Sequence, residues 1–313
     1  MTETVAIVGS GFIGRGWAIS YARAGLDVAL YDPVAGVAEA ALGFIDMVLE
    51  DLARHDLLAG QPVATVRARL RAASDLPAVL DGATYVQENT PEVLESRRAV
   101  FRELDRLAGP NVVLASSTSS FLPSLFTEDL SGRARCIVAH PLNPPYLVPA
   151  VEVVPAAWTA SATVARTRAV LIAAGHEPIM LKKEIDGFVV NRLQGALLQE
   201  AFKLVAEGYA DARDVDRAVA KGLGLRWSFI GPFEVAETNA QGGVKDYIVK
   251  YEALFKRLWS PYTVAWGPLA DALEAEYARQ TPRDKLPERQ LWRDRRLIAL
   301  AAHKRDASDA IGD

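Results

Sequence analysis

Two residues near the middle of the chain have side chains that suit chemistry on an alcohol. His140 ends the apolar run CIVAH and is followed directly by prolines, and Glu152 lies 12 residues further on in VEVVP. An imidazole titrates near neutral pH, so it can remove a hydroxyl proton while a hydride leaves the carbinol carbon. A carboxylate beside it would fix its tautomer and stabilise its charged form. A lone histidine at a strand end is more often structural, so the assignment depends on its neighbours.

Two neutral hydrogen-bond donors stand out beside this pair, Ser119 in SSTSSF and Asn191 in DGFVVNRL. Such donors could hold the substrate oxygen as it becomes a carbonyl, without competing for its proton. Structural explanations stay open for each. Ser119 could cap a helix, Asn191 could pack between helices, and Glu152 could be a surface charge on an edge strand. The remaining histidines have no motif around them: His55, His176 and His303.

A glycine motif near the N-terminus predicts a dinucleotide site. The apolar run VAIVG leads into GSGFIG, with glycines at Gly9, Gly11 and Gly14, and then into a helix that starts near Ile13. The glycines provide a tight turn, close approach of the backbone to a pyrophosphate, and close packing of helix on strand. Free N–H groups at the helix N-terminus attract the phosphates.

Asp32 predicts the type of cofactor. It ends the second strand-like run, 18 residues after Gly14. An acid there accepts hydrogen bonds from the adenosine ribose hydroxyls and repels a 2′-phosphate, which favours NAD over NADP. The alternative is that Asp32, followed by Pro33, only caps the next helix.

The elements that must position these residues alternate between strand-like and helical patterns. This alternation predicts βαβ units, an α/β fold and a Rossmann-type, mostly parallel sheet. Residues 35–81 are long and mostly helical in periodicity, which predicts a helical insertion where a substrate tail could rest. The predicted strands cover residues 5–9, 27–32, 84–88, 111–116, 136–140, 151–155 and 177–182, with a helix at 161–174.

The character of the chain changes near Glu184. Beyond it nearly everything follows helical periodicity, so we predict a Rossmann-like NAD-binding domain over 1–184 and an all-α domain over 185–313. The 35 basic and 39 acidic residues are interspersed, which excludes a basic stripe for nucleic acid or a membrane surface. Cys136 is the only cysteine and is interpreted as a core residue, so no cysteine metal cluster is expected. With no basic leader or long apolar run, we expect a cytoplasmic protein.

At these motifs the sequence resembles the 3-hydroxyacyl-CoA dehydrogenase family, and within it the branch of lambda-crystallin, an L-gulonate 3-dehydrogenase. The resemblance covers essentially the whole chain, through GSGFIGRGWA, YDP, QENTPE, SSTSS, IVAHPLNPPYLVPAVEVVP, GFVVNRLQ, GLGLRWSFIGP and LWRD. It implies oxidation of a secondary alcohol with NAD, and a homodimer formed through the helical domain. It also implies that His140 and Glu152 form the catalytic dyad, with Ser119 and Asn191 beside the substrate.

The same resemblance implies further contacts to the cofactor. Phe12 and Ile13 would touch the pyrophosphate through their backbone, and Ser119 would also lie near the cofactor. Glu92 in TPE and Asn143 in LNPP would reach the nicotinamide side. Arg97 stands where the family often has a lysine, and the two are not interchangeable at a tight site.

Several substrates fit this pattern. Arg226 and Trp227 lie in GLGLRWSFIGP, where acyl-CoA enzymes of the family show a shorter, uncharged stretch, so the resemblance favours a small L-3-hydroxy acid whose carboxylate pairs with Arg226. An acyl-CoA stays open, with phosphates bound by Arg67, Arg69 and Arg71, although such a run is usually a solvated face. L-Carnitine also stays open, with an aromatic cage drawn from Trp227, Trp259, Tyr262 and Trp266.

Two classes of protein without turnover compete with the enzyme. A crystallin-like structural protein would keep the fold for stability, and a nucleotide-sensing regulator would bind NAD(H) only. The intact His140, Glu152 and Asn191 argue against the first, since such a protein has no need for a buried histidine with a carboxylate partner.

Overall fold

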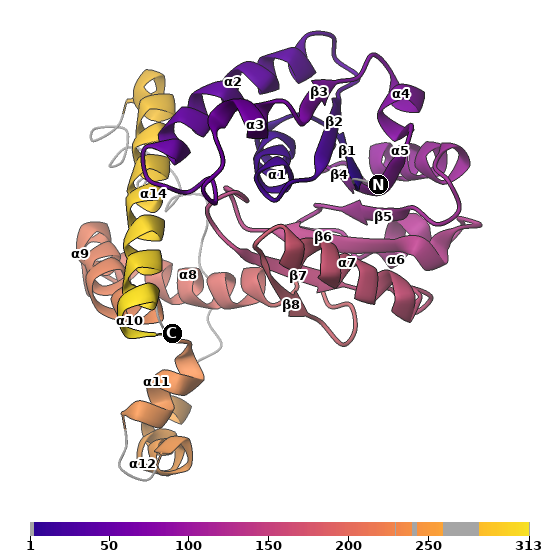
Figure 1. Ribbon diagram of the computed structural model, residues 1–313. Coiled ribbons are helices and arrows are strands. Elements are labelled where there is room, and N and C mark those ends of the chain that lie inside the picture. The colour runs from indigo at the N-terminus through magenta and orange to yellow at the C-terminus, as the bar shows by residue number, and fades with distance from the viewer. Residues whose placement is uncertain (1–2, 229, 240–242, 259–281, 313) are drawn as a thin grey trace. The chain divides into compact units, whose positions relative to one another are not determined.

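The computed structural model describes residues 3–228, 230–239, 243–258 and 282–312 (Figure 1). The chain forms two compact units, one of Met1–Arg192 with Pro287–Asp313 and the other of Leu193–Leu286. The predicted domain boundary near Glu184 stays a prediction. In the structure the C-terminal segment packs with the first unit.

The first unit is built on an eight-stranded sheet in the order β3-β2-β1-β4-β5-β6-β7-β8. All neighbouring pairs are parallel except β6 and β7, so β7 and β8 run opposite to the other strands. This confirms the predicted Rossmann-type, mostly parallel sheet. The strands are β1 (Thr4–Val8), β2 (Asp27–Tyr31), β3 (Leu70–Ala72), β4 (Ala83–Glu88), β5 (Val113–Ser116), β6 (Cys136–Pro141), β7 (Ala150–Val154) and β8 (Glu177–Met180).

Helices cover both faces of the sheet (Figure 1), because its strands carry apolar side chains on both faces. In β1, Val5 and Ile7 point to one core, and Ala6 and Val8 to the other. The first core is closed by α1 (Phe12–Arg23), α2 (Val37–Ala53), α3 (Val63–Arg67) and α7 (Ser161–Ala173). The second is closed by α4 (Leu76–Leu80), α5 (Leu94–Leu107) and α6 (Ser124–Thr127).

The segment between β2 and β4 differs from the predicted run of helix over 35–81. It contains α2 and α3, but then the short strand β3, which pairs in parallel with β2, and α4. The strand was missed because its three residues, LRA, are too few to show an alternating pattern. Pairing with β2 in the folded sheet decides its conformation.

The described residues that follow β8 are helical, which confirms the predicted all-α C-terminal part. None of the helices in the described ranges combines the length and the apolar character of a membrane span. These elements are α8 (Val190–Ala206), α9 (Ala212–Arg217), the π-helical turn η2 (Ala218–Leu223), α10 (Gly224–Trp227), α11 (Pro232–Thr238), α12 (Gly243–Leu258), η3 (Arg283–Lys285) and α14 (Leu286–Ile311).

The last helix, α14, is tied to the first unit. Ile298 is buried in the first core. Asp294 accepts a hydrogen bond from the Tyr146 hydroxyl at 3.3 Å, and Arg305 donates to the carbonyl of Asp56, just beyond α2, at 2.8 Å.

Candidate active site

The turn between β1 and α1 has the shape of a phosphate cradle. Gly9 has a φ of +90°, and a Cβ on Gly14 would lie 1.9 Å from the Gly9 carbonyl oxygen, so neither position accepts a side chain. A Cβ on Gly11 would meet nothing within 4 Å, so open space lies in front of the helix. Because no side chain caps α1, the first backbone N–H groups, at Phe12 and Ile13, are available to an anion. The turn fits a dinucleotide pyrophosphate.

Asp32 is fixed beside this turn. Its carboxylate accepts hydrogen bonds from the backbone N–H of Ser10 at 2.8 Å and of Val34 at 3.0 Å. Each oxygen keeps a further lone pair, which suits ribose hydroxyls. The N-cap of α2 is Gly36, so Asp32 does not cap that helix.

His140 and Glu152 lie directly opposite each other on the antiparallel strands β6 and β7. Cross-strand neighbours share one face of the sheet, which explains why residues 12 apart in the sequence meet. Nδ1 of His140 lies 2.8 Å from Oε2 of Glu152, and the two residues are 7% and 0% exposed. Within the described part of the chain, the His140 ring bonds through Nδ1, and its Nε2 has no hydrogen-bond partner. The pair can therefore offer that nitrogen to a ligand.

The other oxygen of Glu152 binds the start of the helical segment. Oε1 accepts hydrogen bonds from the N–H groups of Val189 and Val190 at 2.6 and 2.9 Å. Burial alone would raise the pKa of the Glu152 carboxyl, but the hydrogen bonds from His140 and these two N–H groups lower it below its usual value. Glu152 is therefore ionised at neutral pH.

The turn before α8 carries backbone strain. Gly187 and Phe188 have φ values of +74° and +51°, and a bulky residue rarely adopts this left-handed conformation. Phe188 is buried, with its ring centroid 5.5 Å from that of His140. The turn therefore places the Phe188 ring beside the His140 imidazole and directs the N–H groups of Val189 and Val190 at Glu152.

Ser119 and Asn191 meet at the end of β5. The Asn191 side-chain amide donates to the Ser119 backbone carbonyl at 2.8 Å, and the Ser119 hydroxyl lies 3.4 Å from that of Ser120. Glu92 holds this loop, because its Oε1 accepts from the N–H of Ser119 at 3.1 Å and of Ser120 at 3.0 Å, and from the Thr118 hydroxyl. Burial would raise the pKa of Glu92, but the Thr118 hydrogen bond and the nearby arginine lower it.

That arginine, Arg97, is only 1% exposed. Its Nε donates to Glu88 at 3.1 Å and its Nη2 to Glu92 at 3.0 Å. Its Nη1 has no hydrogen-bond partner among the residues that the structure describes, and the guanidinium carbon lies 5.4 Å from the Phe121 ring centroid. In this placement Arg97 positions Glu92 and, through it, the Ser119 loop.

The last two predicted site residues are exposed. Asn143 lies in the loop that follows β6. Arg226 lies on α10 of the second unit.

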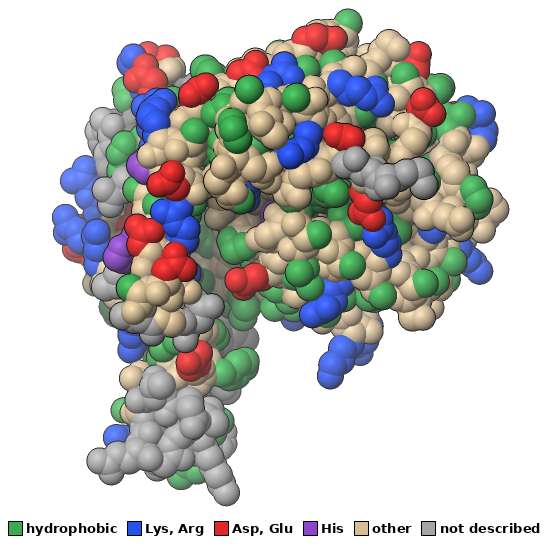
Figure 2. All heavy atoms as spheres, viewed as in Figure 1, with side chains coloured by type: hydrophobic (Ala, Val, Ile, Leu, Met, Phe, Trp, Pro, Cys, Tyr) green, Lys and Arg blue, Asp and Glu red, His purple; other side chains and the backbone are tan. Residues whose placement is uncertain are grey.

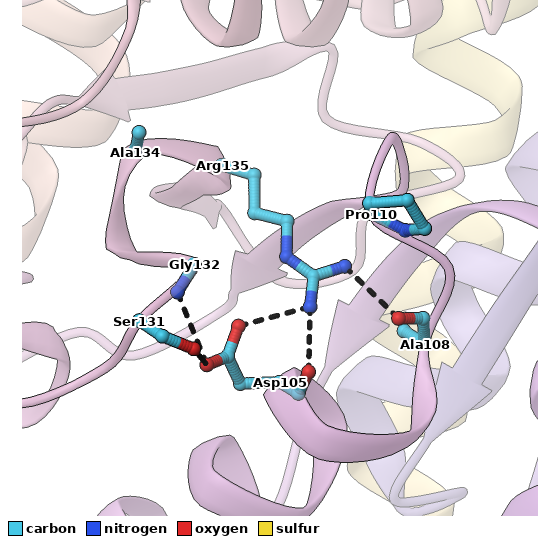
Figure 3. Close-up of a pocket in the computed structure, with 7 residues that line it drawn as sticks. All are labelled: Asp105, Ala108, Pro110, Ser131, Gly132, Ala134 and Arg135. Atoms are coloured by element: carbon cyan, nitrogen blue, oxygen red, sulfur yellow. Dashed lines mark hydrogen bonds and ion pairs between the residues drawn. The ribbon is translucent and has the colours of Figure 1, made fainter.

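A separate depression lies at the opposite edge of the sheet, among Asp105, Ala108, Pro110, Ser131, Gly132, Ala134 and Arg135 (Figure 3). It lies before the starts of β5 and β6, whereas the glycine turn follows β1 and His140 lies near the C-terminal end of β6. Ligands of such sheets bind beyond the carboxyl ends of the strands. Arg135 and Asp105 bond to each other at 2.9 Å across this depression and tie its walls together. Among the described residues, no cluster of His, Cys, Asp or Glu could hold a metal ion.

Two family models together match most of this chain. The NAD binding domain of 3-hydroxyacyl-CoA dehydrogenase matches residues 4–185, and the C-terminal domain of the same family matches residues 187–267. The chain belongs to the 3-hydroxyacyl-CoA dehydrogenase family. The resemblance stated from the sequence is confirmed, and the chain is an oxidoreductase that uses NAD and acts on a CH–OH group.

Individual members of the family align over nearly their full length. The lambda-crystallin homolog of Bos taurus is 41% identical over 96% of this chain and 95% of its own. An L-carnitine dehydrogenase of a Pseudomonas species is 33% identical over 95% of this chain and 92% of its own. A solved structure of 5-formyl-3-hydroxy-2-methylpyridine 4-carboxylic acid 5-dehydrogenase, an NAD+-dependent dismutase, superposes with a TM-score of 0.81 at 29% identity, covering 96% of this chain and 97% of that one.

A polar network that lies behind the candidate site of this chain was not predicted from the sequence. The Ser117 hydroxyl accepts hydrogen bonds from Trp17 Nε1 at 2.9 Å and Gln87 Nε2 at 2.7 Å, and donates to Asn89 Oδ1 at 2.7 Å. It joins α1 to the ends of β4 and β5. The motifs QENTPE and SSTSS contain these residues, but only tertiary contact shows which serine turns inward.

Proposed function

We propose that this dehydrogenase oxidises the hydroxyl of a small L-3-hydroxy acid to the 3-oxo acid, as an L-gulonate 3-dehydrogenase does. The observation that carries the proposal is the buried pair of His140 and Glu152, which leaves Nε2 of the imidazole free. A histidine held in this way suits proton abstraction, because the ionised Glu152 on Nδ1 stabilises the imidazolium that forms when Nε2 takes up a proton.

In the proposed reaction, Nε2 of His140 accepts the hydroxyl proton. Glu152 keeps the other proton on Nδ1 and stabilises the imidazolium that forms. The Ser119 hydroxyl and the second N–H of the Asn191 amide donate to the oxygen as it becomes a carbonyl. Bound NAD supplies the hydride acceptor. Gly9, Gly11, Gly14, Phe12 and Ile13 form its pyrophosphate turn, and Asp32 lies at the ribose. Ser119, Glu92 and Asn143 lie on the nicotinamide side, and Arg97 acts there through Glu92.

The placement of three arginines supports a free acid over a coenzyme A thioester. Arg67 pairs with Asp46 at 2.5 Å, and Arg69 donates to Gln61 at 2.7 Å and to a backbone carbonyl. Arg67 is held through its Nε and Nη1, and Arg69 through its Nη1, by groups of the protein itself. Among the three arginines considered for coenzyme A phosphates, Arg71 is the least engaged, since its hydrogen bond to the Ala78 carbonyl measures 3.4 Å. One such arginine is a weaker site for coenzyme A phosphates than three.

L-Carnitine is the second candidate, favoured by the likeness to an L-carnitine dehydrogenase. Trp227 is exposed on α10 and could face a quaternary ammonium. The other aromatic residues suggested for such a cage, Trp259, Tyr262 and Trp266, lie outside the described residues. In either case Arg226 is a proposed partner of the substrate carboxylate.

A homodimer formed through the helical part belongs to the same proposal. α8 exposes Leu193 and Leu198, which a partner would cover. On the face shown in Figure 2, acidic and basic side chains are interspersed, which suits a small-molecule substrate better than nucleic acid. The cytoplasmic location stays a prediction.

A substrate panel tests the proposal. NADH formation would be followed with L-gulonate, L-carnitine, L-3-hydroxybutyrate and 3-hydroxybutyryl-CoA, and the kcat/KM values compared. We expect kcat/KM for one of the free acids to exceed that for the thioester by about tenfold or more, which is the effect expected of one hydrogen-bonded ion pair. A higher kcat/KM for the thioester would instead favour an acyl-CoA as the substrate. The absence of turnover on all four would favour a structural or nucleotide-sensing protein.

A further inference from the structure

Arg15 is a cation beside the cofactor turn that the proposed mechanism does not use. It lies on α1, directly after Gly14. Its guanidinium carbon is 4.4 Å from the ring centroid of Phe12 and 3.5 Å from that of Phe44 on α2. Two aromatic faces therefore hold the guanidinium and leave its N–H edge for a planar acceptor.

This guanidinium has no counter-ion among the described residues. The charge of Asp294 acts on it, but the two form no ion pair, and Asp294 instead accepts a hydrogen bond from Tyr146. Partial burial lowers the pKa of Arg15. The next arginine of the same helix, Arg23, differs, because it donates to the Tyr146 carbonyl at 3.1 Å. A half-buried cation without a partner gains strongly from an anionic ligand.

The loop that leaves His140 passes over this part of α1. Pro145 lies against Gly16, since a Cβ on Gly16 would be 2.7 Å from the Pro145 Cδ. Tyr146, the next residue, lies near the Arg15 guanidinium. Arg15 thus stands where the cofactor turn, α2 and the His140 loop converge.

We propose that Arg15 binds the carboxylate of the substrate and so selects a free hydroxy acid over an ester or thioester. The proposal rests on the proposed function and adds Arg15 to Arg226 as a second guanidinium at the substrate carboxylate. A guanidinium can donate two parallel hydrogen bonds to a carboxylate, which fixes the distance from that group to the carbinol carbon. An ester carries no charge for Arg15 to neutralise.

The test compares L-3-hydroxybutyrate with its methyl ester. Arg15→Met keeps the stem packed between the rings, and we expect it to raise KM for the acid about tenfold or more and to leave KM for the ester within about twofold. Arg15→Lys should recover part of the loss, because it restores charge without the planar fork. Arg54→Met, on an exposed arginine at the end of α2, is the matched control and should change neither value. The dissociation constant for NADH should stay at the wild-type value in all three.

Each contrary result has a distinct meaning. Equal loss on acid and ester, or no loss on either, would overturn the proposal and make Arg15 structural. Weaker NADH binding with an unchanged KM would also overturn it, because the anion would then be a cofactor phosphate. An acid-specific loss in Arg226→Ala but not in Arg15→Met would assign the carboxylate to Arg226 instead. A wild-type enzyme that prefers the ester, or oxidises neither compound nor L-gulonate, would refute the proposed function itself, and Arg15 with it.

Discussion

The two ends of strand β6 each carry a pair of a basic and an acidic side chain, partly buried at the start of the strand and buried at its end, and the pairs differ in what they leave free. Arg135, in the turn η1 (Arg133–Arg135) before the strand, bonds to Asp105 at 2.9 Å, and His140 near its other end bonds to Glu152 at 2.8 Å. Arg135 spends its terminal nitrogens on Asp105 and on backbone carbonyls, among them that of Ala108 at 3.3 Å. His140 keeps Nε2.

The two carboxylates are held in similar ways. Burial would raise the pKa of Asp105, but hydrogen bonds from Arg135, Gly132 and Ser131 lower it, just as His140 and two backbone N–H groups lower that of Glu152. A carboxylate whose pKa is lowered by a basic partner is therefore not in itself a sign of catalysis. What distinguishes the two pairs is Nε2 of His140, which is free to act on a ligand and lies at the end of the sheet where the cofactor turn lies. The His140–Glu152 pair can therefore do chemistry, whereas the Arg135–Asp105 pair joins two loops.

The largest effect is expected at His140. His140→Gln removes the base but keeps a polar side chain of similar length, so kcat should fall by about 10²-fold or more while NADH binding stays nearly unchanged. Steady-state rates and NADH fluorescence titration measure both quantities. His303→Gln, on an exposed histidine of α14, is the control. A His140→Gln enzyme that keeps most of its turnover would make this pair structural, like the one at the other end of β6.

A smaller loss is expected from Glu152→Gln. The amide would donate to Nδ1 and so force the proton onto Nε2, the nitrogen that must be free to act as base. We expect kcat to fall about 10- to 100-fold, as when the partner of a functional histidine is removed. The change should also lower thermal stability, since an ionised acceptor of two backbone N–H groups is lost. Unchanged rates would show that His140 does not depend on its partner.

Asp105→Asn should affect stability alone. It weakens the contacts to Arg135 and should reduce the free energy of unfolding by on the order of 2 kcal/mol at neutral pH, with turnover unchanged at low temperature. Because the pKa of Asp105 is lowered on folding, its contribution is full above about pH 4 and disappears as the pH falls through the folded-state value. The difference from wild type in urea unfolding should therefore shrink on acidification. Glu103→Gln, on the same helix but exposed, should show neither effect, and a loss of turnover in Asp105→Asn would contradict the division of roles.

Local pattern was enough to predict the cofactor turn, Asp32 and the strand end that carries His140. Glycine spacing and apolar runs report backbone geometry directly, so these features are visible in the sequence. The pairing of His140 with Glu152 needed the family resemblance, because an antiparallel partner strand cannot be identified from one run alone.

Other features depend on contacts that no local pattern encodes. The inward turn of Ser117, the burial of Arg97 between Glu88 and Glu92, and the left-handed backbone of Phe188 all arise from tertiary packing. The same holds for Arg15, whose guanidinium carbon lies 3.5 Å from the ring centroid of Phe44 on α2. Strand β3 was missed for the same reason.

The most direct test of the role of His140 is the primary deuterium isotope effect on kcat/KM, measured with the preferred hydroxy acid labelled at its carbinol carbon. If His140 removes the hydroxyl proton as the hydride leaves, its loss slows that step relative to binding and release. We expect His140→Gln to show a normal isotope effect at least as large as that of the wild type, on a rate about 10²-fold lower. A slowed variant with no isotope effect would contradict this role, because the step limited by the missing imidazole would not be the one that breaks the C–H bond.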